Sequence, residues 1–191
     1  MSSFFDDTKN AGLLLLIIAI IQIAFSVIVV FAFDDYKNAE MWKKILYLVG
    51  MILSALIFGI LGLDIKGGSC RIQIGGFFSD VTSKFGVLVA ITAAMGFTNI
   101  ISGVFSLVAF GGMDVFTIIV GVLLIVMAYL MISGGELAGN VIWIILLIIY
   151  IIGIILSIFA CLVLVGIPLL LLYIMLLVFL LSPEVKSKMG M

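Results

Sequence analysis

Histidine is absent from this chain of 191 residues, and charged residues make up only 10% of it. Soluble domains carry about 25% charged residues, whereas hydrophobic residues account for 66% here. The missing histidine removes the most common general base and metal ligand. A net charge of −1 leaves no basic patch that could neutralise nucleic-acid phosphates. The composition excludes a soluble domain and a nucleic-acid partner, and it predicts an integral membrane protein.

Cysteine is almost as scarce. The two cysteines, Cys70 and Cys161, form no CxxC pair, and the hydropathy pattern predicts that they lie at opposite faces of a membrane. We therefore expect two unpaired thiols. Without histidine or clustered cysteines, we expect no metal site and no cofactor.

The hydrophobic residues gather in long runs that predict an all-α transmembrane bundle. The first run spans 23 residues, which exceeds the ~7–15 residues of a signal-peptide core and suits a bilayer core of about 30 Å. We interpret it as a retained transmembrane helix. A single membrane domain over residues 1–191 is expected, with an interfacial loop at 64–84. The predicted helices span about residues 11–33, 45–63, 85–110, 115–132, 141–163 and 167–181.

The last two helices come from one uncharged run, residues 141–181. As a single helix it would be about 61 Å long, twice the hydrocarbon core, so the chain must reverse direction. Gly166 and Pro168 favour a reversal near that point. Six helices in three hairpins follow, although five crossings remain an alternative.

The distribution of lysine and arginine predicts the orientation. Six crossings place more positive charges on the side of the termini than on the other side, which carries Lys37, Lys43 and Lys44. By the positive-inside rule, the termini and loop 64–84 are then cytoplasmic, in a multi-pass protein of the cell membrane. The positive residues on the terminal side are Lys9, Lys66, Arg71, Lys84, Lys186 and Lys188.

Small and polar residues recur along the predicted helix 85–110 in steps of four and three, which places them on one helical face. In lipid, such a face marks close packing and hydrogen bonding between helices. We therefore expect this segment to be the central helix, and we expect a similar pair in helix 141–163 to pack in the same way. These residues are Thr92, Gly96, Asn99, Gly103 and Ser106, with Gly153 and Ser157 in the later helix.

Gln22 and Asn99 are the strongest polar groups inside the predicted helices. Each lies near the middle of its segment, so both are expected at a similar depth. An interhelical hydrogen bond that fixes the register is the favoured interpretation. A polar lining for a solute or water path is the alternative.

No Asp, Glu, Lys, Arg or His falls inside the six predicted helices. Ion-coupled transporters normally carry ionisable groups there, so this absence weighs against a pump or a secondary transporter. No nucleophile is accompanied by a histidine base, and the carboxylates are scattered over loops. We therefore expect no enzymatic activity.

The loop at 64–84 contains the run Lys66-Gly67-Gly68-Ser69-Cys70-Arg71. Two cations and several backbone amides favour contact with an anionic lipid headgroup through Lys66 and Arg71. The run lacks the Gly-Lys-Ser/Thr ending of a P-loop. A plain interfacial turn, with a short β-hairpin, is the alternative.

Val-Gly pairs at 49–50, 120–121 and 165–166 punctuate the even-numbered segments of the predicted hairpins. In this pattern the chain, mainly over residues 86–166, resembles the HdeD-like family of short-repeat membrane proteins. That resemblance implies a six-helix membrane protein connected with acid-stress resistance, and it brings no catalytic residues with it.

The sequence is compatible with two kinds of function. The first is a non-enzymatic scaffold, stress-response factor or accessory subunit of a membrane complex, whose small-residue faces would meet a partner helix or a second copy. The second is a small channel or permease for a neutral or apolar solute. A hydrated path at Gln22 and Asn99 would favour the second, and a dry, closely packed centre would favour the first.

Overall fold

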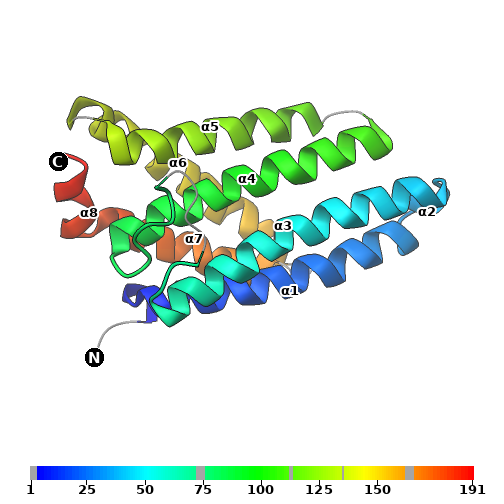
Figure 1. Cartoon of the computed structure of the whole chain (residues 1–191), viewed down its shortest axis with the longest axis horizontal. Coiled ribbons are helices and arrows are strands. Elements are labelled where there is room, and N and C mark those ends of the chain that lie inside the picture. The colour runs from blue at the N-terminus through cyan, green and yellow to red at the C-terminus, as the bar shows by residue number, and fades with distance from the viewer. Residues whose placement is uncertain (1–3, 72–75, 112–113, 135, 162–165) are drawn as a thin grey trace.

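The protein folds as an assembly of long helices, seen here in a computed structural model (Figure 1). The structure describes residues 4–71, 76–111, 114–134, 136–161 and 166–191, and no strand occurs among them. The all-α prediction is confirmed. The elements are η1 (Phe4–Asp6), α1 (Thr8–Ala32), α2 (Asp34–Lys37), α3 (Met41–Gly67), α4 (Lys84–Phe110), α5 (Asp114–Ser133), α6 (Glu136–Ala160), α7 (Gly166–Leu181) and α8 (Pro183–Lys188).

Five of these helices are long and apolar enough to cross a membrane, namely α1, α3, α4, most of α5 and most of α6. Helix α7 is equally apolar but has only 16 residues. At 1.5 Å per residue it is about 24 Å long, shorter than a bilayer core of about 30 Å. The long apolar helices therefore suit a membrane protein. The sixth predicted span corresponds to α7, which is shorter than the other five.

The second predicted helix is longer at both ends than its expected range of 45–63. Gly68 adopts the left-handed conformation (φ 65°), and its N–H group bonds to the carbonyl oxygens of Asp64 and Ile65. The glycine pair is thus the C-terminal end of α3 and not the turn of a β-hairpin. The longer helix also takes in Lys44 and Asp64, which flank the predicted range and are buried. The predicted loop 64–84 shortens to the segment after Gly67.

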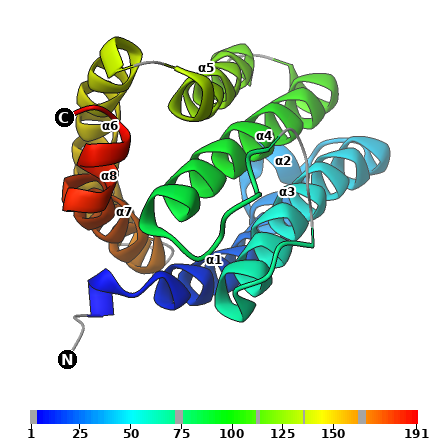
Figure 2. The ribbon, with the colours of Figure 1, turned by 60° about the vertical axis from the view of Figure 1, so that its left-hand side comes forward.

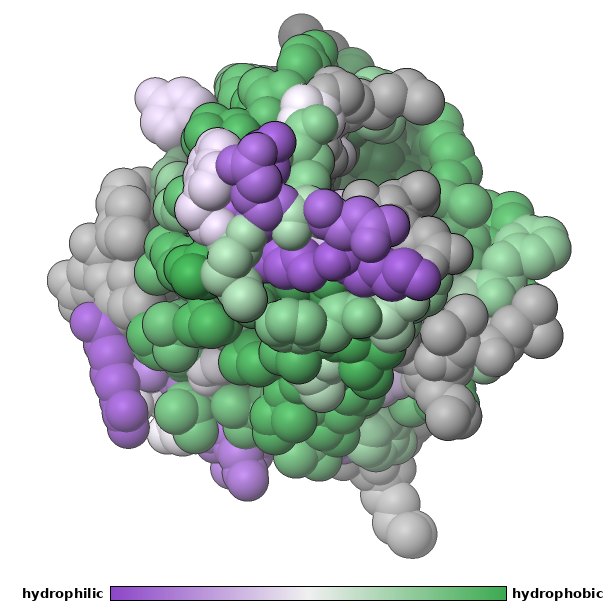
Figure 3. All heavy atoms as spheres, turned by 90° about the vertical axis from the view of Figure 1, so that its right-hand side faces the viewer, coloured by the Kyte–Doolittle hydropathy of each residue, from purple (hydrophilic) through white to green (hydrophobic). Residues whose placement is uncertain are grey.

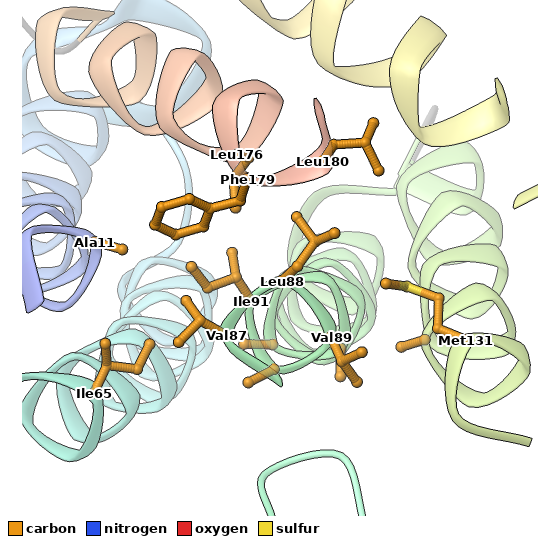
Figure 4. Close-up of a cluster of buried hydrophobic side chains, with 14 of the residues drawn as sticks. Ala11, Ile65, Val87, Leu88, Val89, Ile91, Met131, Leu176, Phe179 and Leu180 are labelled. Carbon is orange, nitrogen blue, oxygen red and sulfur yellow. The ribbon is translucent and has the colours of Figure 1, made fainter. Parts of the chain in front are cut away.

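Helix α4 occupies the centre of the fold, as the stripe of small residues predicted (Figure 2). It is far more buried than the other long helices. Its side chains Val87, Leu88 and Ile91 are fully buried. In Figure 4, Val87 lies on the side of Ile65 of α3, and Leu88 and Ile91 point toward the side chains of α7. Val89 lies on the side of Met131 of α5.

The long helices pack side by side, α1 with α3 and α4 with α5, and likewise α3 with α4 and α6 with α7. In the first two pairs a glycine faces a glycine. A Cβ added to Gly12 would lie 2.6 Å from the carbonyl oxygen of Gly62, and one added to Gly62 would lie 2.7 Å from that of Gly12. The same 2.7 Å separation holds in both directions between Gly96 and Gly121. Only glycine permits backbones to approach so closely.

Candidate binding pocket

A pocket of about 320 Å³ lies between α1, α3, α4 and α7. Helix α7 contributes only Leu169 and Tyr173, both from its first half, whereas the other three helices contribute residues over several turns. The pocket therefore lies beside the beginning of the short helix. Its wall consists of Ile18, Ile21, Gln22, Phe25, Ser26, Tyr47, Met51, Phe58, Met95, Thr98, Asn99, Ser102, Leu169 and Tyr173.

Gln22 and Asn99 line this same pocket from α1 and α4. Among the described residues, the Gln22 side chain has one weak contact, from its Nε2 atom to the sulfur of Met51 at 3.9 Å. The side-chain amide of Asn99 makes no hydrogen bond to any residue that the structure describes. No direct bond joins the two amides within the described chain, so the hydrogen-bonded pair we favoured is absent there.

The hydroxyl groups near the two amides are mostly used inside their own helices. Ser26 donates to the carbonyl oxygen of Gln22 at 2.6 Å, and Ser102 donates to that of Thr98 at 2.7 Å. A hydroxyl that bonds within its own helix has less hydrogen-bonding capacity for a bound molecule. The polar groups that the pocket offers are therefore the amides of Gln22 and Asn99, together with the hydroxyl groups of Tyr47 and Tyr173.

Most of the other wall residues are apolar, and no charged residue belongs to the wall among the described part of the chain. An apolar wall with a few convergent polar groups is typical of a small-molecule site, whose volume usually starts near 300 Å³. Neutral amides both donate and accept hydrogen bonds, but they do not balance a charge. The chemistry fits a neutral, mainly apolar molecule.

Aromatic side chains gather around the pocket wall toward the α2 end of the bundle. Tyr47, a wall residue, packs against Tyr36 of α2 and Phe110 of α4, with ring centroids 5.8 and 5.6 Å away. Beyond them, the ammonium group of Lys44 donates to the carbonyl oxygen of Lys37. Figure 3 views this end, where hydrophilic residues form a small group on a largely hydrophobic surface.

At the opposite end, the pocket floor is more apolar and contains Tyr173. The ring of Tyr173 lies beside Tyr150 of α6, with centroids 6.4 Å apart. The Tyr150 hydroxyl in turn hydrogen-bonds Thr92 of α4 at 3.2 Å, while the Thr92 hydroxyl donates to the Leu88 carbonyl at 2.7 Å. This buried polar contact is one that the sequence did not suggest.

The residues predicted to pack helices together do lie in helix contacts or in the interior. Gly96 meets Gly121 of α5, and Gly153 meets the ring of Tyr173. Gly103 and Ser106 are buried in α4. Ser157 is buried too, and a Cβ added to Gly166 would lie 2.6 Å from its carbonyl oxygen.

Lys66 and Arg71, the predicted lipid ligands, flank the end of α3. Both are exposed. The Arg71 backbone N–H donates to Asp64 Oδ2 at 2.8 Å, and its Nε lies 3.5 Å from Asp64 Oδ1. Asp64 is 2% exposed, so it holds the beginning of the loop against the protein. Sequence reasoning missed this role because Asp64 was assigned to the loop, although a Gly-Gly pair is also the usual signal of a helix C-terminus.

Cys70 lies in the same loop and is free, as is Cys161. Burial raises the pKa of the Cys70 thiol, and the negative charges of Asp64 and Asp80 raise it further. The thiol therefore stays protonated at neutral pH, which does not favour nucleophilic chemistry. Within the described chain, no group of His, Cys, Asp and Glu is arranged to hold a metal ion.

The loop before α4 is built around Asp80. Its carboxylate accepts hydrogen bonds from the backbone N–H groups of Thr82 and Ser83 at 3.0 and 3.1 Å, and the Ser83 side chain accepts from Gly86 N–H at 3.0 Å. Ser83 is therefore the N-cap of α4. Partial burial raises the pKa of Asp80, but the hydrogen bonds from Ser83 and Thr82 outweigh it and lower the pKa to about 2.

Comparison with protein-family models, characterised proteins and solved structures found no match to this chain. The pocket itself is therefore the main guide to function. Sequence reasoning identified two of its wall residues, Gln22 and Asn99, but not the aromatic ends at Tyr47 and Tyr173. Those depend on which helices become neighbours, and no local pattern carries that information.

Proposed function

We propose that the protein is a non-enzymatic integral membrane protein that binds, and passes across the membrane, a neutral and mainly apolar solute. The observation that carries this proposal is the pocket between α1, α3, α4 and α7 with two amides in an apolar wall. A dry, closely packed centre at Gln22 and Asn99 would have favoured a scaffold instead. Of the two functions predicted from the sequence, the pocket favours a small channel or permease.

The free hydrogen-bonding capacity of the amides supports this function. A polar group inside a membrane is costly unless it has a partner, and Asn99 has none among the described residues. A solute with a hydroxyl, carbonyl or amide group would supply that partner. A charged solute would lose its hydration and gain no counter-charge from this wall.

An accessory subunit of a membrane complex, or a stress-response factor, remains the second candidate. A shallow groove on the outer face of α1 and α3 supports it, because small residues such as Ala19, Ala55 and Gly59 line that groove and admit a partner helix or a second copy. The resemblance to HdeD-like proteins belongs with this candidate and stays a proposal.

We further propose six crossings in three hairpins, within a single membrane domain of the cell membrane. The pairing of α6 with α7 supports this count, as does the position of η1 and α8 at the same end of the bundle (Figure 1). A 16-residue helix crosses when flanking residues reach the interface or the bilayer thins. The positive residues then place the termini and the loop after α3 in the cytoplasm.

Lys66 and Arg71 are proposed to contact anionic lipids at that cytoplasmic face. Their exposure at the end of α3 supports this role. The double substitution Lys66→Ala with Arg71→Ala should reduce retention of the detergent-solubilised protein on vesicles that contain phosphatidylserine. Equal retention of both proteins would remove the idea.

The pocket proposal is tested with a photoreactive alkanol that carries a diazirine group. Labelling of the purified wild-type protein in nanodiscs should fall when unlabelled octanol is added, and much less when octane or octanoate is added. Asn99→Leu should reduce the competable labelling, because it removes a hydrogen-bonding partner. Labelling that no octanol concentration displaces would contradict the proposal.

A further inference from the structure

We propose that Tyr173 sets the size of molecule that the pocket accepts, and that Gly153 of α6 positions the Tyr173 ring for this task. The inference rests on the proposed solute-binding function and adds the determinant of specificity. It assigns Gly153 a role beyond the helix packing that the sequence suggested. Tyr173 is a wall residue, whereas Gly153 acts only through it.

Gly153 lies directly against the face of the pocket that Tyr173 forms. A Cβ added to Gly153 would lie 2.6, 2.7 and 2.8 Å from the Cε1, Cδ1 and Cζ atoms of the Tyr173 ring. These separations are far shorter than van der Waals contact, so the absence of a side chain at 153 creates the space that the ring occupies. The ring is thus seated on the backbone of α6.

The α6 side of the ring offers no room for movement. Tyr150 lies beside Tyr173 and is 1% exposed, and its hydroxyl is engaged by Thr92. The free volume next to Tyr173 is the pocket itself. A ring displaced from Gly153 therefore moves into the pocket and shortens it.

The order of the wall residues along α1 and α4 indicates which part of a bound molecule contacts the Tyr173 ring. Ile18 and Met95 lie one turn before Gln22 and Asn99 on α1 and α4, and with Phe58 and Tyr173 they form an apolar floor. A neutral amphiphile with its polar group at the amides then extends its apolar body toward this floor. Tyr173 is consequently the limit on body length, and we name the ligand class as neutral amphiphiles with a short apolar body.

Competition by a series of straight-chain alkanols against the photoreactive alkanol tests this idea. The wild-type protein should show a chain-length cutoff. Gly153→Ala should weaken competition by alkanols near that cutoff about tenfold, the scale expected for one methylene group in an apolar pocket, and should leave the shortest ones nearly unchanged. A purely structural role of Gly153 would weaken all chain lengths alike.

Rescue separates the ring from general packing. Gly153→Ala combined with Tyr173→Leu should restore binding near the cutoff, since the ring that was displaced is gone. Gly59→Ala is the matched control, because its new Cβ would meet only Ala19 at 3.9 Å outside the pocket. If Gly153→Ala does not fold, Tyr173→Leu alone must shift the cutoff to longer alkanols.

The outcomes distinguish this inference from the function on which it rests. If the wild-type protein shows no competable labelling at all, the proposed function fails. If the wild-type protein binds alkanols but its cutoff is unchanged in Tyr173→Leu, or Gly153→Ala weakens every chain length equally, the size-limiting role is overturned and the binding function stands.

Discussion

The two halves of α4 differ in how the protein surrounds them. Residues 86–94 are all buried, whereas residues 95–110 alternate between buried, half-buried and exposed positions. The first half meets α7 and the core cluster shown in Figure 4, while the second half borders the pocket. The same helix therefore packs closely at one end and forms part of a pocket wall at the other.

The polar groups of the two halves follow the same division. In the closely packed half, Thr92 shares a hydrogen bond with Tyr150. In the open half, the Asn99 side chain has no bond to a described residue. A satisfied polar group stabilises helix contacts, and an unsatisfied one facing free volume is available to a ligand.

Truncation of a side chain in the closely packed half should have the largest effect. Ile91 is fully buried, so Ile91→Ala leaves a cavity and should lower the free energy of unfolding by about 2 kcal/mol or more. Val108 is 61% exposed on the same helix, and Val108→Ala should change the free energy of unfolding little. Unfolding in mixed detergent micelles measures both. Equal effects would contradict the division of α4.

Adding a methyl group at a contact between two glycines should lower the free energy of unfolding somewhat less. Gly121→Ala places a methyl group 2.7 Å from the carbonyl oxygen of Gly96, and this overpacking should destabilise the protein by about 1–3 kcal/mol. Gly59→Ala meets no such atom and should be neutral or stabilising, because alanine favours helix. The same unfolding assay compares them. A neutral Gly121→Ala would show that the two backbones separate easily.

The buried hydrogen bond should appear as coupling in a double-mutant cycle. Thr92→Val and Tyr150→Phe should each destabilise the protein, and the double variant should cost little more than either, with a coupling of about 0.6 kcal/mol and at most about 1.7. Their contact at 3.2 Å is the reason. Strict additivity would mean that the bond contributes nothing.

Gln22 and Asn99 should behave in the opposite way. Because no bond joins them in the described chain, Gln22→Leu and Asn99→Leu should be additive within about 0.3–0.5 kcal/mol, and neither should destabilise the protein strongly. Binding of the photoreactive alkanol should nevertheless fall. A strong coupling between them would restore the register-fixing hydrogen bond that the sequence suggested.

The loop that precedes the closely packed half should respond weakly to acid. The pKa of Asp80 lies near 2, below its ordinary 3.8, so its contribution to stability is present above pH 3.8 and is lost as the pH falls through about 2. Hydrogen exchange of the first amides of α4 should therefore accelerate in that window. Asp80→Asn should remove the pH dependence, and a persistent dependence would implicate another group.

Much of the helical architecture was visible in the sequence, and the reasons are local. Hydrophobic runs longer than a bilayer core define α1 and α4. The spacing of Thr92, Gly96 and Gly103 predicts that α4 is central, and it is the most buried of the long helices. The predicted end of the second helix was wrong because Gly67-Gly68 suits a tight turn as well as a helix terminus. For that reason Asp64 was assigned to the loop and not to the helix.

The pocket could be predicted only in part. Gln22 and Asn99 stood out because amides are rare in apolar helices. The pocket itself arises because α7 is short and begins beside the middle of its neighbours, and because Gly153 admits the ring of Tyr173. Both are tertiary relations between segments far apart in the chain, and no periodicity encodes them.

Mass spectrometry of the photolabelled protein can locate the residues that the alkanol contacts, and so tests whether a solute binds between α1, α4 and α7. We predict that octanol-sensitive labels from the diazirine alkanol fall on α1, α4 and α7 around Gln22, Asn99 and Tyr173. Labels on the lipid-facing sides of α5 and α6 should not respond to octanol. Octanol-sensitive labels spread evenly over all helices, or absent from these three, would contradict a solute site between them.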